Sequence, residues 1–179
     1  MIIKTKPILL LTVLLIASGL FIAACSKSED SKKEAITKVL EHQFTGPDEE
    51  FMDLMWNPKY KTVVNDKEEN KEFDQYVQEA YGPYFTESGL DFFIAAMGTQ
   101  YPTYAYENEY ELTLKDVTIK QNGDNPDLYT FVASVGYKKN GEENTANVKG
   151  KVTFSTKEEG KITRFEYKDD DGLSDELRK

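Results

Sequence analysis

The chain has a single histidine, His42, and it is the first candidate for proton transfer because an imidazole titrates near neutral pH. Next to a carboxylate, His42 would serve as the general base of a small hydrolase or isomerase. It lies on the flank of the helical stripe formed by Ile36, Val39 and Leu40. That place also suits a surface histidine near a helix C-terminus, where a positive charge is stabilised. We expect the surface position, and the enzyme stays an alternative.

Other signatures of catalysis or metal binding are missing from the sequence. It has no G-x-S-x-G elbow and no glycine-rich phosphate loop. One histidine and one cysteine are too few for a typical zinc site. The acidic stretches 122–127 and 169–172 lack the alternating spacing of a calcium loop. We therefore expect no metal and no cofactor, and a binding role rather than a catalytic one.

Aromatic side chains form the most prominent group of candidate ligand-binding residues. The chain has 11 Tyr, 10 Phe and 1 Trp. Tyrosine combines a large rigid contact area with a polar tip, which suits contacts to glycans, peptides or proteins. We nevertheless expect the tyrosines to fill the junction between the last helix and the first strand and the tryptophan to cap the core at a helix end, and binding stays the alternative. The candidates are Tyr81, Tyr84, Tyr101, Tyr104, Tyr106 and Trp56.

The N-terminus has the layout of a secretory signal. Lys4 and Lys6 precede an apolar stretch over 8–24, which ends in small residues before Cys25. The tetrapeptide Ile22-Ala23-Ala24-Cys25 resembles the lipobox of bacterial lipoproteins. The resemblance implies cleavage between Ala24 and Cys25, with a diacylglycerol on the cysteine sulfur. Two buried acyl chains, at about 0.8 kcal/mol per CH₂, anchor a protein stably.

This layout divides the chain into four parts. Residues 1–24 are the expected lipoprotein signal peptide, and 25–32 are the lipidated cysteine with a flexible tether. Residues 33–168 form one domain, and 169–179 form an acidic C-terminal tail that we expect to be frayed. The alternative for 8–24 is an uncleaved membrane helix, since 17 apolar residues reach the lower limit of about 17–25 for spanning. Either way, we expect the domain at the extracytoplasmic face of the cell membrane.

The charge of the chain limits its partners. With 32 acidic and 22 basic residues, the formal net charge is −10. Such a surface repels phosphate backbones, so we expect no nucleic acid. It also repels anionic headgroups, so contact with the bilayer needs the acylated Cys25. Expected partners are a cell-envelope protein, a glycan or a small apolar ligand. A structural or stress-related lipoprotein without a dedicated ligand remains an alternative.

The first half of the domain has helical periodicity. A first helix is predicted over 33–44, with Ser31 as its cap and Glu34 as the capping partner. Further helices are predicted over 47–57, with Pro47 in the first turn, over 69–81 and over 86–97. A polar loop is expected around 65–67.

From Tyr101 onward the apolar period changes to two, which predicts strands. The alternation changes phase near Lys115-Asp116, which predicts a β-bulge. Asn122–Pro126 is a predicted turn, and Asn140-Gly141 predicts a two-residue hairpin. A final strand is expected over 162–167. Together, these segments predict about four antiparallel strands.

Helices followed by an antiparallel meander predict an α+β fold, with N-terminal helices packed on a curved sheet. In order and length, the elements over 33–167 resemble the nuclear-transport-factor-two-like (cystatin-like) superfamily, as in small lipoproteins of Gram-positive bacteria. The resemblance implies a cone with a cavity between helices and sheet. Members use that cavity for catalysis, for binding or for no known purpose, so the resemblance alone does not decide the function.

Overall fold

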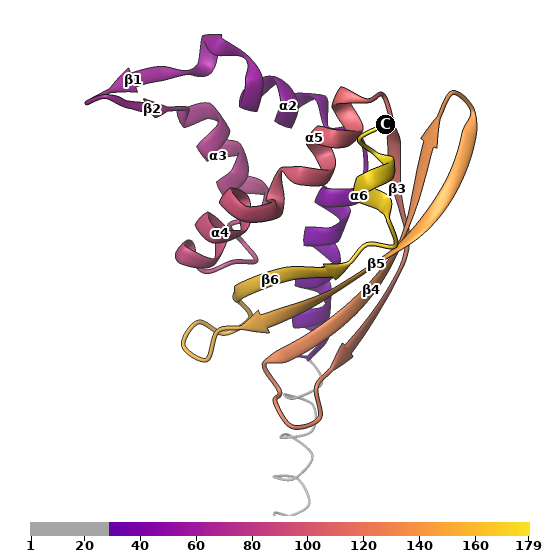
Figure 1. Cartoon of the computed structure of the whole chain (residues 1–179). Helices are drawn as coiled ribbons and strands as arrows, with labels where there is room; N and C mark the ends of the chain where they lie inside the picture. Colours follow the sequence, from indigo (N-terminus) through magenta and orange to yellow (C-terminus); the bar gives the residue numbers. More distant parts are fainter. Residues whose placement is uncertain (1–28) are drawn as a thin grey trace, which may run out of the picture.

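Residues 29–179 are described by a computed structural model, in which helices cover one face of a curved four-stranded antiparallel sheet (Figure 1). The expected α+β class and the number of strands in this sheet are thereby confirmed. The predicted signal peptide, its cleavage site, Cys25 and residues 26–28 of the tether lie outside the described residues. The rest of the predicted flexible tether, 29–32, is helical, so the expectation is wrong for these four residues. Within 29–179, no helix is long and apolar enough to cross a membrane.

The sheet follows the chain order β3-β4-β5-β6. The register between β3 and β4 shifts between Leu114 and Asp116, which confirms the predicted bulge. Asn140 and Gly141 have φ values of 55° and 87°, and they close the β4–β5 hairpin as the sequence predicts. The strands are β3 (Glu111–Gln121), β4 (Leu128–Lys139), β5 (Glu142–Phe154) and β6 (Ile162–Asp169).

A first helix spans 29–44 and runs along the sheet (Figure 1). Asp48, Asn70 and Thr86 cap the N-termini of α2, α3 and α4, each accepting a hydrogen bond from a backbone N–H three residues on. The other helices are α2 (Glu49–Trp56), η1 (Pro58–Tyr60), α3 (Lys71–Ala80), α4 (Glu87–Phe93), the π-helix η2 (Ile94–Gly98), α5 (Gln100–Glu107) and α6 (Leu173–Glu176).

Two predicted helix starts are wrong in detail. The first helix is already formed at residue 29, so Ser31 lies inside it and does not cap it. Pro47 precedes the capping residue Asp48 and is not part of the first turn of α2. Serine and proline are both favoured at helix starts, but here Ser31 lies inside its helix and Pro47 lies before the cap of α2.

The predicted change to strand at Tyr101 is wrong, because residues 100–107 form helix α5. Tyr101 and Ala105 lie one helical turn apart and are both buried. Pro102 lies in the first turn, where its missing N–H has no helical partner to lose. Tyrosine favours strands, and that propensity is overridden here by the burial of one helix face.

The predicted polar loop at 65–67 contains the turn of a two-stranded hairpin, formed by β1 (Thr62–Val64) and β2 (Lys67–Glu69). Asn65 and Asp66 have φ values of 51° and 60°, as a type I′ turn requires. The hairpin extends away from the four-stranded sheet (Figure 1). Because both strands are largely exposed, no alternation of apolar residues marks them in the sequence.

The expectation of a frayed C-terminal tail is also wrong. Leu173 and Leu177, one turn apart around α6, are buried in the core. The Tyr101 hydroxyl donates a hydrogen bond of 3.1 Å to Asp170. Burial and the Asp170 charge raise the pKa of Tyr101, so its hydroxyl stays protonated and available as the donor. The prediction relied on the acidic composition of this segment and overlooked its two leucines, which are at helical spacing.

The core between helices and sheet is largely aromatic. Phe165 of β6 lies at its centre, with its ring 5.4 Å from Phe93 and 5.1 Å from Phe131. One polar side chain, Gln43, is buried there, and its Nε2 donates to the Tyr81 hydroxyl and to the Gly98 carbonyl, both at 2.8 Å. These bonds satisfy the amide and fix the first helix against the C-terminal end of α3 and against η2.

Candidate functional site

An apolar groove lies between α3 on one side and α4 with η2 on the other. Its volume is about 490 Å³, within the range of known ligand pockets. Phe73 and Val77 line it from α3, one helical turn apart. Leu90 and Ile94 line the opposite wall at the same spacing. The two walls thus present matching apolar rows over at least one turn each.

Carboxylates stand along both walls of this groove. Asp74 comes from α3, and Glu87 and Asp91 come from α4. None of the three pairs with a lysine or arginine within residues 29–179, and no basic residue lines the groove. Carboxylates of one sign around a low-dielectric wall focus a negative potential into the groove.

The surrounding half of the domain reinforces this potential. Residues 29–110, which hold both walls, carry eighteen acidic and seven basic residues, whereas the sheet residues 111–169 carry ten of each. The negative charge of the described chain is therefore concentrated on the helical side, where the groove opens.

The two walls are held by different parts of the fold. On the α3 side, the Asn70 side chain caps the helix and donates a hydrogen bond of 2.7 Å to the Leu54 carbonyl of α2. On the α4 side, Gly89 lies against β6, where a Cβ would come within 2.6 Å of the Ile162 carbonyl. Only glycine permits this close approach, which fixes α4 on the sheet.

His42 does not lie in this groove. Its side chain is exposed, and its ring centroid is 5.1 Å from that of Tyr81. Partial burial of the ring lowers the pKa of His42, although Asp48 and Glu41 act in the opposite direction. Among residues 29–179 it forms no hydrogen bond to a carboxylate. Within residues 29–179, His42 lines another pocket together with Glu41 and Asp48, but no hydrogen bond orients its ring toward either acid.

The aromatic candidates from the sequence do not form one site. Tyr81 and Tyr101 are buried in the core and offer no surface to a partner, so for these two the core interpretation holds. Tyr84 and Tyr104 are partly buried, and the Arg178 guanidinium lies 5.0 Å from the Tyr104 ring. Tyr106 and Trp56 are about half exposed, at 48% and 53%. The sequence analysis grouped these aromatic residues because most of them are close in sequence. In the fold they differ in burial, from the core to the exposed surface.

The groove itself was missed by sequence reasoning. Its apolar residues were recognised as the buried faces of two helices, but nothing in the sequence indicates that α3 and α4 leave a gap between them. A partial signal was present, because Asp74 follows Phe73 and Asp91 follows Leu90. An acid directly beside a buried stripe marks the boundary of the apolar face.

The described residues therefore define an α+β domain with a groove on its helical side, and this groove has apolar walls flanked by carboxylates. Among residues 29–179, no group of three histidine, cysteine, aspartate or glutamate side chains gathers as a metal site would need. No family model, curated protein or solved structure matches the chain.

Proposed function

We propose that this protein is a lipid-anchored accessory domain at the extracytoplasmic face of the cell membrane, and that it holds a partner protein there. The anchor rests on the lipobox-like sequence Ile22–Cys25 behind a charged and then apolar segment. Its test is the intact mass of membrane-extracted protein beside a Cys25→Ala variant. A chain starting at Cys25 with an added diacylglycerol supports the anchor, and a full-length chain without lipid overturns it.

The binding role rests on one observation, the groove between α3 and α4. Apolar walls formed by Phe73, Val77 and Leu90 favour an apolar occupant, while the flanking carboxylates favour a positive one. Both requirements are met by a cationic amphipathic peptide segment, which would lay apolar anchors between the walls and lysine or arginine side chains along the rims. We assign such a segment of a partner protein as the occupant.

We also propose that the domain is related in shape to the nuclear-transport-factor-two-like superfamily. The support is the order of elements, with helices followed by an antiparallel meander, and the bulge near Asp116 that helps a sheet curve around helices. The groove proposed here lies between two helices, whereas the resemblance implies a cavity between helices and sheet. The binding proposal therefore does not depend on this relationship.

The experiment uses two synthetic amphipathic peptides as probes. The first has leucines on one face of a helix and lysines on the other, and the second has glutamates in place of the lysines. Fluorescence anisotropy measures their binding to the lipidated protein in detergent. We expect binding of the lysine peptide only. The double variant Asp74→Lys/Asp91→Lys should weaken it about tenfold or more, since two attractive contacts become repulsive.

The matched control is the double variant Glu72→Lys/Glu79→Lys, two exposed changes on α3 outside the groove that shift the net charge by the same amount. It alters the net charge in the same direction and should change the affinity less than about twofold, as surface charges away from the contact do. If both variants weaken binding equally, the peptide is attracted by net charge alone, and the groove is not its site. Binding of the glutamate peptide would also overturn the assignment.

A further inference from the structure

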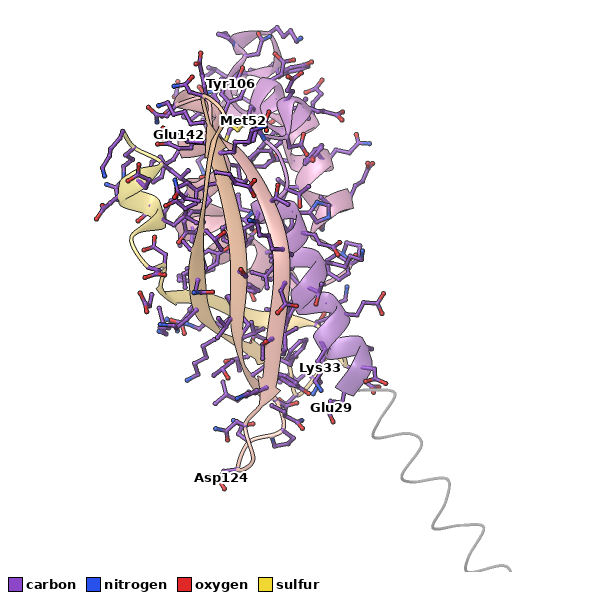
Figure 2. The ribbon with its side chains drawn as sticks, turned by 90° about the vertical axis from the view of Figure 1, so that its right-hand side faces the viewer. Glu29, Lys33, Met52, Tyr106, Asp124 and Glu142 are labelled. Carbon is purple, nitrogen blue, oxygen red and sulfur yellow. The ribbon has the colours of Figure 1, made fainter. Side chains whose placement is uncertain are left out.

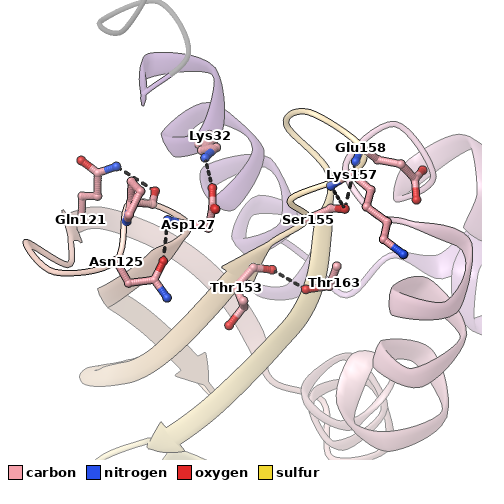
Figure 3. A network of polar contacts seen from close by, with 10 residues as sticks. Lys32, Gln121, Asn125, Asp127, Thr153, Ser155, Lys157, Glu158 and Thr163 are labelled. Carbon is pink, nitrogen blue, oxygen red and sulfur yellow. Dashed lines mark hydrogen bonds and ion pairs between the residues drawn. The ribbon is translucent and has the colours of Figure 1, made fainter.

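The first described turn of the first helix, residues 29–32, is held between two turns of the sheet. The Lys32 ammonium forms an ion pair of 2.7 Å with Asp127, at the end of the β3–β4 turn. The same group lies 5.3 Å from the Phe154 ring at the end of β5. On the other side, a Cβ on Gly160 of the β5–β6 turn would lie 3.8 Å from the Ser31 hydroxyl. Figure 3 shows Lys32 and both turns at this end of the molecule.

Both turns are stiffened by their own side chains. In the β3–β4 turn, the Asn122 side-chain oxygen accepts hydrogen bonds from the backbone N–H groups of Asp124 and Asn125. In the β5–β6 turn, the Ser155 hydroxyl accepts from the backbone of Lys157 and Glu158 (Figure 3). Such local bonds define the backbone of a turn without help from the core. The helix start and the two turns therefore form one rigid end of the domain.

The chain between Cys25 and this rigid end is short. Three residues separate Cys25 from residue 29, so the Cα atoms of 25 and 29 lie at most about 14 Å apart even in a fully extended chain. The helix 29–44 is about 24 Å long, and β4 extends about 40 Å toward the opposite end. Figure 2 shows Glu29 and Asp124 at one end of the molecule and Glu142 at the other. A lipid on Cys25 would therefore keep the end with Glu29 and Asp124 near the bilayer. When the domain stands upright on this end, the end with Glu142 lies too far from the bilayer to touch it.

We propose that the end formed by the turns 122–127 and 155–160, here called the turn face, lies against the phospholipid headgroups. The β4–β5 turn at Asn140 and the hairpin β1–β2 then point away from the membrane (Figure 1). This orientation rests on the proposed lipid attachment at Cys25. The turn face exposes Asp124, Glu158 and Glu159 against one exposed cation, Lys157, so its net charge is negative and it has no electrostatic attraction for anionic lipid. The covalent tether sets the orientation, and the turn face has no lipid affinity of its own.

Three exposed acidic positions allow the orientation to be measured with matched labels. Asp124→Cys and Glu158→Cys lie on the turn face, and Glu142→Cys lies at the opposite end. Because the chain has one cysteine and lipidation occupies its sulfur, the new thiol is the only free one for a fluorophore. The full lipidated protein is placed in phosphatidylcholine vesicles that contain a lipid with a nitroxide on its headgroup. We expect quenching at positions 124 and 158 to be several-fold stronger than at 142.

Equal quenching at the three positions, or stronger quenching at 142, overturns the proposal. Intact mass before reconstitution separates this failure from failure of the anchor, because only chains that carry diacylglycerol enter the assay. An insertion of about twelve glycine and serine residues after Ser28 tests the cause, since a longer flexible tether lets the domain reorient. The contrast between positions should then fall toward one, and an unchanged contrast would overturn the tether as the orienting element.

Discussion

Two hairpins of this chain close with similar turns but lie in different surroundings. In β1–β2 the turn residues are Asn65 and Asp66, and in β4–β5 they are Asn140 and Gly141, all four with positive φ. The strands β1 and β2 pair over three residues, with Val63 exposed to 74%, whereas β4 and β5 pair over twelve and cover the core. The turn chemistry is enough to shape a hairpin. Burial of one face decides whether the hairpin belongs to the cooperative unit that unfolds globally.

The largest contrast is expected from deleting one apolar side chain in the four-stranded sheet, to which β4–β5 belongs, and one in the exposed hairpin β1–β2. Phe165→Ala removes a fully buried ring at the centre of the aromatic core, and it should lower the free energy of unfolding by about 3–5 kcal/mol. Val63→Ala on β1 should change it by less than about 0.5 kcal/mol, because little apolar surface is buried there. Urea unfolding followed by circular dichroism measures both. A cost for Val63→Ala near that of Phe165→Ala would show that β1 is packed in solution.

A smaller contrast is expected between two glycines of the sheet region. At Gly150 of β5, an added Cβ would lie 2.2 Å from the Phe131 ring and 2.4 Å from the Glu166 carbonyl. Gly150→Ala should therefore cost about 1–3 kcal/mol through overpacking. Gly123 in the β3–β4 turn has no atom within 4 Å of an added Cβ, so Gly123→Ala should stay within about 0.5 kcal/mol of the parent. Thermal unfolding of the two variants side by side decides this, and equal losses would place Gly123 in a packed environment.

The buried parts of the fold were the more predictable from the sequence. The bulge at Leu114/Asp116 and the turn at Asn140-Gly141 both interrupt a regular alternation of apolar and polar residues. The core requires that alternation in the strands, so each interruption can be recognised in the sequence. The exposed hairpin β1–β2 has no such alternation, so its turn residues appeared to be a loop. The prediction for the segment of helix α5 was wrong although the segment is partly buried. Its tyrosines favour strands, and the helix is recognised only from the tertiary packing of Tyr101.

The candidate site could be predicted only in its separate pieces. The apolar stripes of α3 and α4 follow from periodicity, but the groove depends on how far apart the two helices are held. That distance is set by long-range contacts such as Asn70 to Leu54 and Gly89 to Ile162, which no local pattern encodes. Similarly, Tyr81 and Tyr106 are indistinguishable by type, while one is 2% and the other 48% exposed.

The most direct test of the comparison changes the two turns themselves. Alanine disfavours positive φ by about 1 kcal/mol, so Gly141→Ala should lower the global free energy of unfolding by about that amount. Asp66→Ala strains its turn in the same way, but its global effect is limited, because a strained β1–β2 can open while the rest of the domain stays folded. The global loss cannot exceed the free energy of this local opening. We therefore expect an almost unchanged urea midpoint for Asp66→Ala, together with faster amide hydrogen exchange over Thr62–Glu69. Equal global losses in the two variants would mean that β1–β2 is coupled to the core as tightly as β4–β5, and the distinction between a hairpin held by its turn and one held by burial would not apply to this molecule.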